Sequence, residues 1–363
     1  MVQVAGDEKS DSGFLLTGKP PRGWGRVLEL FLGRDQRKKK VSHAWLDLLR
    51  TGKPDLVWAH NLAGGEKWGW SLEMLNLARE ACPALWTLHD MWGLGDSSES
   101  YWQEDQMVEG GRWKGAMVEG LKGLGVEKLR RSRVERVCRA EAKCPILLTA
   151  PSRWLAKLTT QITGQTCRQL PNPIDLKTFS PGERAAARRA LGLPSTGQLV
   201  LAGADSLNEP RKGMDLLARA WKEVNLPEAR LVLFGRGKTE IPGGISLGSL
   251  QKDRAMADAY RAADLYVHPA RMENAPCTIQ ESMACGTPVL AFAVGGIPEM
   301  VENGQNGFLC PFVSAEALGQ ALKEALGNSA RLEKMREACR QAAEESRPME
   351  KFDELLKEIS QIA

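Results

Sequence analysis

The sequence predicts an α/β protein made of two doubly wound, Rossmann-type domains. Three observations point to this class. From Gln198 onward, short apolar runs alternate with segments of helical periodicity, a pattern typical of a parallel sheet covered by helices. The first half contains apolar runs that we expect to be buried strands, at residues 55–60, 85–89 and 146–149. The chain has 363 residues, a length that suits about two domains.

In the second half, strands should alternate with helices along the whole segment. The expected strands are residues 199–202, 230–234, 245–247, 264–268, 288–292 and 307–310. The expected helices are residues 214–224, 255–263, 279–285 and 315–326. The segment Phe234-Gly-Arg-Gly237 ends the second of these strands, where a glycine such as Gly235 lets the backbone turn sharply or approach a ligand.

The first half is less regular. We expect a helix at residues 72–81 and a mostly exposed insertion at residues 93–125, which carry many glycines and charges. The turn-rich segment Pro171-Asn-Pro-Ile-Asp175 marks the domain boundary. The resulting domains are residues 1–171, residues 172–345 and a terminal helix within 346–363. That helix needs a partner surface for its apolar stripe, which consists of Phe352, Leu355, Ile359 and Ile362.

The composition is ordinary for a soluble globular protein, with 43% hydrophobic and 26% charged residues and a net charge of +4. The dense basic runs, Arg34 to Lys40 and Lys128 to Arg139, do not dictate nucleic-acid binding. In the second run Leu129, Val134 and Val137 recur at helical spacing. Either a plain solvated helix or a basic amphipathic helix on an anionic membrane or acidic acceptor fits this pattern.

The cysteines argue against a metal or redox motif. There are 8 of them, with no C-x-x-C pair and no histidine at ligand spacing, so we expect reduced thiols. The N-terminus lacks a basic segment followed by an apolar one, and no stretch approaches about 18 apolar residues. We therefore expect a cytoplasmic protein, with peripheral contact at the inner face of the membrane as the alternative that the basic helix raises.

The segment from Arg271 to Leu290 carries most of the functional signal. It reads as a loop entering a helix, with Asn274 as the cap and Pro276 in the first turn. We expect the backbone N–H groups of residues 274 to 278 to point outward unpaired, and such a helix end binds phosphate.

Two carboxylates flank this helix start. Glu273 lies before it and Glu281 about 9 Å further along, at about 1.5 Å per residue, so the two could hold opposite ends of one extended ligand. A sugar nucleotide has that shape, because its diphosphate would meet the helix end and its two sets of hydroxyls would each need an acceptor. The plain alternative is a solvent-facing helix whose glutamates are merely solvated.

Two cations follow the first strand of the second half. Arg211 and Lys212 lie where the ligand crevice of an open sheet is found, and they could neutralise a leaving diphosphate by a bidentate fork and a point charge. Solvated cations near a helix start are the alternative.

Histidines end several predicted strands. His89, followed by Asp90, should emerge at the top edge of the first sheet, where a neutral imidazole can accept a bond from a sugar hydroxyl. His60 and Asn61 end the adjacent strand and could line an acceptor pocket, while His268 could contact a ligand through its backbone. For His89, a histidine satisfied by nearby backbone groups is the alternative.

Taken together, these motifs resemble the retaining GT-B glycosyltransferases, and most closely bacterial exopolysaccharide enzymes of the colanic-acid type. The family motifs are Glu273-x7-Glu281, Ala284-Cys-Gly-Thr-Pro-Val-Leu290, Gly295-Gly-Ile-Pro-Glu299 and Asn306-Gly-Phe308. The landmarks shared with the subgroup are Thr87-Leu-His-Asp-Met-Trp92, Ala150-Pro-Ser-Arg-Trp154, Pro171-Asn-Pro-Ile-Asp175 and Arg211-Lys-Gly213. The likeness spans residues 50 to 345.

The resemblance implies a two-domain enzyme with the donor bound mainly by the second domain and the acceptor by the first. Glu281 would bond the nucleotide ribose, His89 would lie near the transferred sugar, and Arg211 with Lys212 would carry the diphosphate charge. The transferred sugar and phosphate would be held by Glu273 and by the segment Asn274, Ala275, Pro276, Cys277 and Thr278. No metal is usually required in this family, and retention is usually explained by front-face attack in which the departing phosphate takes the acceptor proton.

Three departures qualify the resemblance. The family's basic residue usually lies five positions before the lysine, where this chain has Leu207, so Arg211 would have to substitute. The subgroup's cysteine-bearing insertion is replaced by cysteine-free sequence at residues 93–125. Val2 to Ala5 resembles the family's second strand, which leaves no first strand, no glycine-rich loop and no first helix. We expect either that roughly 30 upstream residues, one strand and its crossover, are missing or that the first domain is rearranged and weakly active.

The resulting hypothesis is a retaining glycosyltransferase that moves a hexose-type unit from a nucleoside diphosphate sugar to a saccharide or lipid-linked acceptor in cell-surface polysaccharide assembly. A non-catalytic module that binds sugar nucleotides or glycans is the alternative that the incomplete first domain raises. An epimerase of the same two-domain architecture is a third reading.

Overall fold

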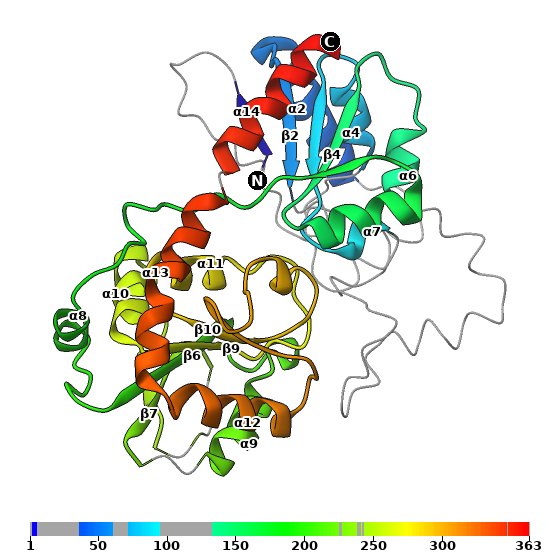
Figure 1. Cartoon of the computed structure of the whole chain (residues 1–363). Helices are drawn as coiled ribbons and strands as arrows, with labels where there is room; N and C mark the ends of the chain where they lie inside the picture. Colours follow the sequence, from blue (N-terminus) through cyan, green and yellow to red (C-terminus); the bar gives the residue numbers. More distant parts are fainter. Residues whose placement is uncertain are drawn as a thin grey trace. The chain divides into compact units, whose positions relative to one another are not determined.

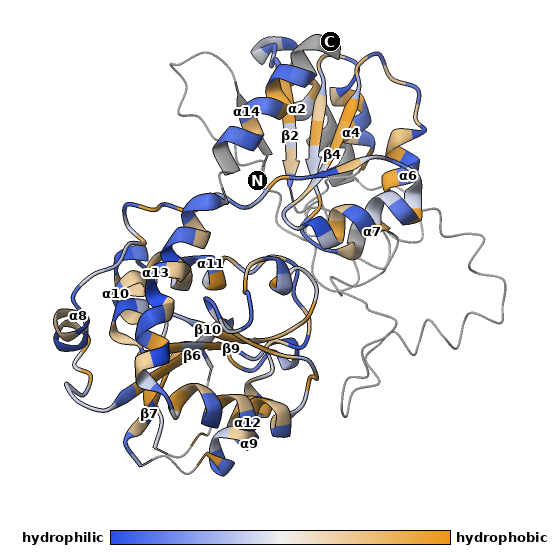
Figure 2. Cartoon of the chain, in the orientation of Figure 1, coloured by the Kyte–Doolittle hydropathy of each residue, from blue (hydrophilic) through white to orange (hydrophobic). Residues whose placement is uncertain are grey.

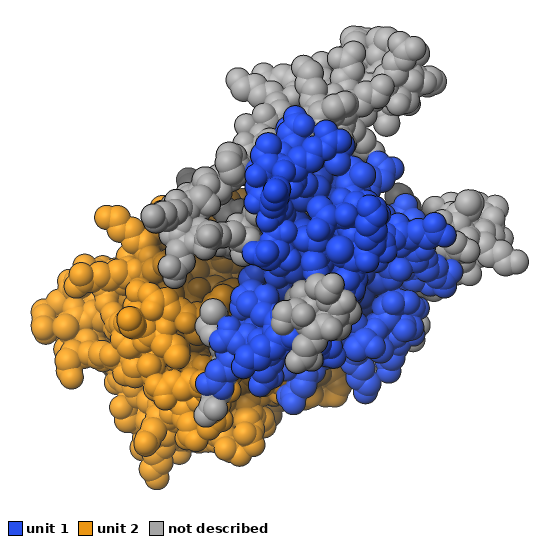
Figure 3. Space-filling view, turned by 90° about the horizontal axis from the view of Figure 1, so that it is seen from above, with its two compact units in different colours: residues 1–100, 114–170, 349–363 blue, residues 101–113, 171–348 orange. Residues whose placement is uncertain are grey.

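The computed structural model describes residues 2–5, 36–60, 72–94, 133–224, 227–237, 241, 243–346 and 348–362. These residues fold into two compact units, coloured separately in Figure 3. Unit 1 holds the described residues within 1–100, 114–170 and 349–363, and unit 2 holds those within 171–348. Each unit is an α/β fold built largely on parallel strands, as predicted.

Unit 2 is built on one parallel sheet with the strand order β11-β10-β9-β6-β7-β8. Its strands are β6 (Gln198–Ser206), β7 (Ala229–Arg236), β8 (Ile245–Ser246), β9 (Leu265–His268), β10 (Val289–Phe292) and β11 (Gly307–Cys310). Its helices are α8 (Arg184–Ala190), α9 (Met214–Glu223), α10 (Asp253–Ala262), α11 (Cys277–Ala284), α12 (Ala315–Leu326) and α13 (Ser329–Glu345). In Figure 1, α9 and α12 lie together on one side of the sheet, and α10 and α11 lie on the other.

This arrangement buries the strands on both faces. Every residue of β9 and β10 is buried, and Figure 2 shows apolar strands between helices whose outer faces are polar. A parallel sheet needs this cover, because its crossover helices lie on both faces and its strands therefore read as continuous apolar runs. The continuous runs made these strands recognisable from the sequence.

The predicted elements of unit 2 all occur, and α12 and β11 begin and end at the predicted residues. Among the predicted elements, the largest difference in bounds is at β6, which continues from the predicted end at Ala202 to Ser206. Its last residues are weak strand formers, but Gly203 pairs with Phe234 and Ser206 with Arg236 of β7. Tertiary pairing therefore extends this strand beyond its apolar run.

Unit 1 has a sheet with the order β1-β2-β3-β4-β5. Its strands are β1 (Val2–Ala5), β2 (Leu56–His60), β3 (Ala84–Thr87), β4 (Ile146–Ala150) and β5 (Cys167–Gln169). Its helical segments are α2 (Gln36–Gly52), α4 (Leu72–Ala78), η2 (Met91–Leu94), α6 (Arg133–Cys138), α7 (Arg153–Thr163) and α14 (Pro348–Ile362). The strands β2 to β5 are parallel, whereas β1 pairs antiparallel with β2 at the edge. Val2 to Ala5 resembles the family's second strand in sequence, but β1 runs antiparallel to its neighbour, unlike the strands of a parallel doubly wound sheet.

The terminal helix α14 belongs to unit 1. Leu355 is buried in an apolar cluster with Leu56 and Leu85 of the sheet, and Phe352 stacks on Trp58 with ring centroids 4.7 Å apart. The sheet of unit 1 is therefore the partner surface that the apolar stripe requires. The side chains of Ile359 and Ile362 lie outside the described residues.

The basic run before residue 140 is only partly described. Residues 128–132 and all of the predicted insertion beyond Leu94 lie outside the described residues. In α6, Val134 and Val137 are buried within unit 1 at 0% and 1% exposure. These two side chains therefore pack in the core and do not face a membrane surface.

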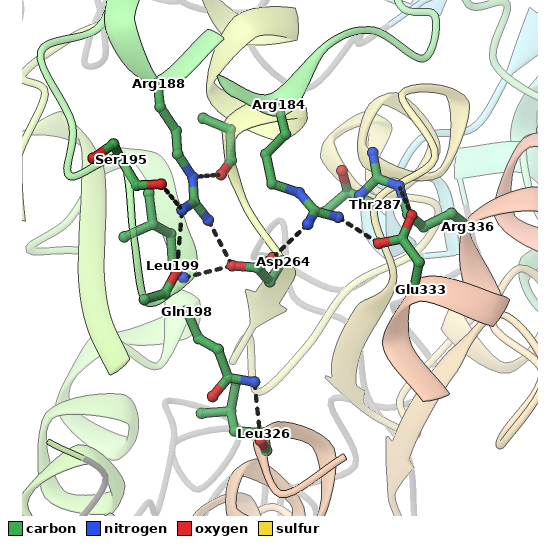
Figure 4. Close-up of polar contacts among 12 residues, drawn as sticks. Arg184, Arg188, Ser195, Gln198, Leu199, Asp264, Thr287, Leu326, Glu333 and Arg336 are labelled. Carbon is green, nitrogen blue, oxygen red and sulfur yellow. Dashed lines mark hydrogen bonds and ion pairs between the residues drawn. The ribbon is translucent and has the colours of Figure 1, made fainter. Parts of the chain in front are cut away.

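An ion-pair network that is buried at Arg188 and exposed at Glu333 holds the amino ends of β6 and β9 (Figure 4). Asp264 accepts from Arg188 at 2.8 Å and from the backbone N–H of Leu199 at 2.7 Å, and it pairs with Arg184 at 3.2 Å. Arg184 in turn pairs with Glu333 of α13 at 2.7 Å. A pocket of about 310 Å³ lies beside this network, and none of the predicted site residues lines it.

Candidate active site

The predicted donor-site cations and Glu273 converge in unit 2. The turn η4 (Pro210–Lys212) follows β6, and Glu273 lies in the loop between β9 and α11. The two segments approach closely at Gly213, whose φ is +67°. A Cβ at this position would lie 1.8 Å from the Pro269 carbonyl oxygen. The backbone N–H of Arg271 also donates to the Arg211 carbonyl at 2.9 Å. Only glycine at position 213 allows the backbone to come this close to Pro269.

Glu273 is the centre of this cluster. Its side chain is 8% exposed, and its Oε1 lies 2.5 Å from Lys212 Nζ and 3.6 Å from Arg211 Nη1. Burial alone would raise the pKa of Glu273, but His268, Lys212 and Arg211 together outweigh burial and lower it to about 2. Glu273 is therefore an ionised, buried carboxylate, and the alternative of solvated glutamates is wrong for this residue.

Glu281 has a different environment. It lies in α11, and its Oε2 accepts a hydrogen bond of 2.9 Å from the hydroxyl of the fully buried Tyr260 in α10. Burial raises the pKa of Glu281, and the bond from Tyr260 opposes this rise. The two acids are therefore held differently, Glu273 by cations and Glu281 by a neutral donor.

The start of α11 differs from the prediction. The helix begins at Cys277 after Pro276, which makes no side-chain cap, so the assignment of Asn274 as the cap was wrong. Asn274 is buried, and its carbonyl accepts from Gly296 at 3.0 Å, while the Ala275 carbonyl accepts from Asn172 Nδ2 at 3.1 Å. The loop is thus fixed through its carbonyls.

One of the five backbone donors predicted at this helix start is absent. Pro276 has no N–H to offer. Within the part of the chain that the structure describes, the N–H groups of Cys277 and Thr278 donate to no backbone carbonyl. The helix start therefore offers an anion two amides beside the Glu273 cluster.

Gly235 has a structural explanation. Its φ is +129°, a Cβ there would lie 1.9 Å from the Ala204 carbonyl oxygen, and its N–H donates to Gly248 at 2.8 Å. The close approach of β6 and β7 therefore requires glycine at this position. Its contact with a donor stays a prediction.

In unit 1, the two histidines that were predicted separately form a pair. His60 ends β2, and His89 lies two residues beyond the end of β3, which stops at Thr87 rather than at His89. His60 Nδ1 lies 2.9 Å from His89 Nε2. Burial, and then the neighbouring His89, lowers the pKa of His60 to about 4, and burial lowers the pKa of His89. Both rings are therefore neutral at pH 7.

The remaining acceptor-side candidates are less defined. Asp90 follows His89 and is half-buried, whereas Asn61 lies outside the described residues. Among the described residues, no group of three or more histidine, cysteine, aspartate or glutamate side chains could hold a metal ion. Within the same residues, no helix is long and apolar enough to cross a membrane.

Sequence reasoning missed three polar residues beneath the site. Tyr260 holds Glu281, Asn172 holds the Ala275 carbonyl, and Tyr266 lies 3.2 Å from His268 Nδ1. The two tyrosines lie in apolar segments that read as core, and only their hydroxyl contacts reveal a polar role. Asn172 lies in a segment that was noted as a turn and as a landmark of the resembling subgroup, with no role given to its side chain.

Comparison with known proteins relates most of the second unit to one family. Residues 188–346 match the family model described as glycosyl transferases group 1. This segment is therefore similar to a group 1 glycosyltransferase domain. The D-inositol 3-phosphate glycosyltransferase of Mycobacterium sp. (strain KMS) is 37% identical over 157 residues, which are 38% of this chain and 34% of that protein. Its counterpart from Mycobacterium leprae (strain TN) is 35% identical over 178 residues, 44% of this chain and 41% of that protein. The chain thus spans about two fifths or less of the curated relatives it matches.

Solved structures extend the likeness beyond the group 1 domain. The sucrose-phosphate synthase of Thermosynechococcus elongatus has a TM-score of 0.65 and 22% identity, covering 90% of this chain and 78% of that one. Anabaena HepE in complex with UDP-glucose has a TM-score of 0.63 and 18% identity, covering 88% and 82%. At these identities the likeness shows the fold, two Rossmann-like domains of the GT-B type. The predicted fold class is confirmed.

Proposed function

We propose that this protein is a retaining glycosyltransferase. It takes a hexose-type unit from a nucleoside diphosphate sugar and passes it to a saccharide or lipid-linked acceptor in cell-surface polysaccharide assembly. The group 1 domain supports the reaction class, and the complex of Anabaena HepE with UDP-glucose supports a sugar nucleotide as the donor. The exopolysaccharide role rests on the resemblance of the sequence motifs to enzymes of the colanic-acid type.

One observation carries the proposal. Lys212 and Arg211 meet a buried, ionised Glu273 directly beside the start of α11. A purely structural ion pair would not need two cations on one carboxylate beside a helix end that offers two further amides. The cluster suits a ligand that brings negative charge to the cations and hydroxyls to the carboxylate.

The donor-side roles follow from this cluster. Arg211 and Lys212 carry the diphosphate charge, so that the proposal requires no metal ion. Glu273 accepts hydrogen bonds from hydroxyls of the transferred sugar. Glu281, oriented by Tyr260, accepts hydrogen bonds from the ribose hydroxyls. The segment Asn274, Ala275, Pro276, Cys277 and Thr278 surrounds the phosphate.

The reaction is a single substitution at the anomeric carbon. The acceptor hydroxyl oxygen forms a bond to that carbon on the face from which the diphosphate leaves. The bond from the anomeric carbon to the diphosphate oxygen breaks, and its electron pair stays with the diphosphate. The proton of the acceptor hydroxyl passes to a departing phosphate oxygen. The protein then contributes positioning and stabilisation of the developing phosphate charge.

Unit 1 supplies the acceptor side in this proposal. His89 lies near the transferred sugar, and His60, Asn61 and Asp90 line the acceptor pocket. The neutral state of His89 suits it to exchange hydrogen bonds with sugar hydroxyls rather than to act as a charged acid. We place the reaction in the cytoplasm, at the inner face of the membrane where the acceptor is lipid-linked.

The test is transfer or hydrolysis of nucleotide sugars by the whole chain. The substrates are UDP-glucose, UDP-galactose and GDP-mannose, and released nucleotide is measured with and without a saccharide acceptor. Glu273→Ala and His89→Ala should each abolish release, whereas Glu337→Ala, an exposed acid on α13, should not change it. Binding without turnover in the parent chain would favour the non-catalytic module, and an epimerised donor recovered without acceptor would favour the epimerase.

A further inference from the structure

His268 is a buried histidine directly beneath Glu273. It is the last residue of β9 and is 4% exposed. Its Nε2 faces Glu273 Oε1 across 3.6 Å, which is beyond hydrogen-bond length. Among the described residues, Nε2 has no hydrogen-bond partner. A buried polar atom without a partner costs about 1 to 3 kcal/mol, so its placement calls for an explanation.

The other ring nitrogen determines the tautomer. The Tyr266 hydroxyl lies 3.2 Å from His268 Nδ1, and Thr278 Oγ1 lies 3.5 Å from the same atom. Burial, opposed by Glu273, lowers the pKa of His268, so the ring is neutral and carries one proton. With the proton on Nδ1, the lone pair of Nε2 would face an ionised carboxylate. The geometry therefore favours a Tyr266 hydroxyl that donates to Nδ1 and an N–H at Nε2 that points at Glu273.

Lys212 competes for the same carboxylate oxygen. Its ammonium lies 2.5 Å from Glu273 Oε1, the atom that His268 Nε2 faces. Under the proposed function, Lys212 must turn to the donor diphosphate. Glu273 would then be a buried carboxylate without its closest partner, which is costly. A movement of roughly 0.7 Å would bring His268 Nε2 to the usual N–H···O distance of about 2.9 Å.

We propose, on the basis of the proposed function, that His268 is a positioning residue that takes over Glu273 when the donor diphosphate draws Lys212 away. Tyr266 keeps the imidazole in the tautomer that makes this exchange work. Glu273 then stays ionised and in place to receive the sugar, while Lys212 is free for the phosphate. In this role the His268 side chain acts only through Glu273.

The first test needs no ligand. The chain has 4 histidines, so ¹⁵N-histidine labelling gives few ring signals, and a His268→Gln variant assigns the one in question. In the free protein, His268 should be the Nε2–H tautomer. Lys212→Met imitates the departure of the lysine, and it should move the Hε2 proton of His268 downfield as the bond to Glu273 forms. An Nδ1–H tautomer, or an Hε2 signal unmoved by Lys212→Met, would overturn the proposal.

The second test uses UDP-glucose, UDP and UMP in calorimetry with the whole chain. His268→Leu should weaken UDP-glucose binding by about 10-fold or more, as expected for a hydrogen bond to a charged group, and leave UMP binding unchanged. His268→Gln, which keeps a donor near the position of Nε2, should restore most of the affinity for UDP-glucose. A structural role would weaken all three ligands alike, and that result contradicts the proposal. If the parent chain binds none of the nucleotides, the proposed donor function fails, while the ligand-free signals still decide the role of His268.

Phe292→Leu is the matched control for packing. Phe292 is fully buried in β10, the strand next to β9. The Phe292→Leu variant should have a lower melting temperature. Any loss of affinity in this variant should be equal for UMP and UDP-glucose. If Phe292→Leu reproduces the ligand-specific loss of His268→Leu, the effect is one of packing and the proposal is wrong.

Discussion

Glu273 and Lys212 are the residues on which the proposed chemistry of unit 2 depends. Each is expected to bind a different part of the donor, yet in this structure they bind each other at 2.5 Å. This ion pair has two consequences. It keeps the buried carboxylate ionised, and it sets a cost that a ligand must offset when it draws the two groups apart.

Replacing Glu273 by glutamine should therefore separate binding from turnover. The amide leaves Lys212 free for phosphate, so UDP binding should strengthen severalfold, while nucleotide release from UDP-glucose should fall by about 100-fold or more. Calorimetry with UDP and a nucleotide-release assay measure the two effects. Weaker UDP binding in Glu273→Gln would show that the ion pair with Glu273 does not limit the binding of phosphate by Lys212.

The histidine pair of unit 1 predicts a pH dependence. His60 has a folded-state pKa of about 4, below its ordinary value of 6.5. The unfolded chain then binds the proton more readily, so the contribution of His60 to stability is complete above pH 6.5 and is lost as the pH falls toward 4. Urea unfolding followed in unit 1 should show this decline, and His60→Gln should flatten it. A parent profile that is level between pH 6.5 and 4 would contradict the neutral pair.

At the scale of elements, one long-range contact stabilises each unit. Helix α14 follows unit 2 in sequence but packs on the sheet of unit 1 through Leu355. In unit 2, Asp264 at the start of β9 ties α8 to β6 through Arg188, whose side chain is 5% exposed. Both contacts join segments far apart in the chain, one apolar and one ionic.

Leu355→Ala should destabilise unit 1 by about 2 to 5 kcal/mol, the range for a buried leucine. Asp353→Ala, an exposed position on the same helix, should change stability by less than about 0.5 kcal/mol. Hydrogen exchange of the unit 1 strands measures both. Equal effects of the two variants would mean that α14 does not depend on its apolar stripe.

Asp264→Ala should destabilise unit 2 by about 3 to 5 kcal/mol, because it leaves Arg188 buried without its carboxylate. The surface pair of Arg331 with Glu324 is the contrast, since the Glu324 side chain is 60% exposed. Glu324→Ala should cost about 0 to 1 kcal/mol. Urea denaturation followed in unit 2 distinguishes a structural network from a set of unimportant surface pairs.

At the scale of the whole molecule, the donor is expected on unit 2 and the acceptor on unit 1. A ligand that binds only folded unit 2 should therefore stabilise that unit by mass action, by about 2.7 kcal/mol at 100 times its dissociation constant. Hydrogen exchange with a panel of nucleotide sugars should show added protection in β6, β9 and α11. Protection confined to unit 1 would mean that the donor binds unit 1. That result would contradict the proposal that unit 2 binds the donor and unit 1 the acceptor.

The sequence by itself determined the fold class, most strands and helices, and the two cations, Arg211 and Lys212, that gather beside Glu273. Parallel strands buried on both faces leave continuous apolar runs, and glycines such as Gly213 are required by local crowding, so both leave a trace in the sequence. The tertiary structure alone decided the partners: Lys212 with Glu273, Tyr260 with Glu281, His60 with His89, and β1 antiparallel to β2. These contacts join residues distant in the chain, and a side chain's partner depends on how strands and loops are brought together in space, which periodicity along the chain does not encode.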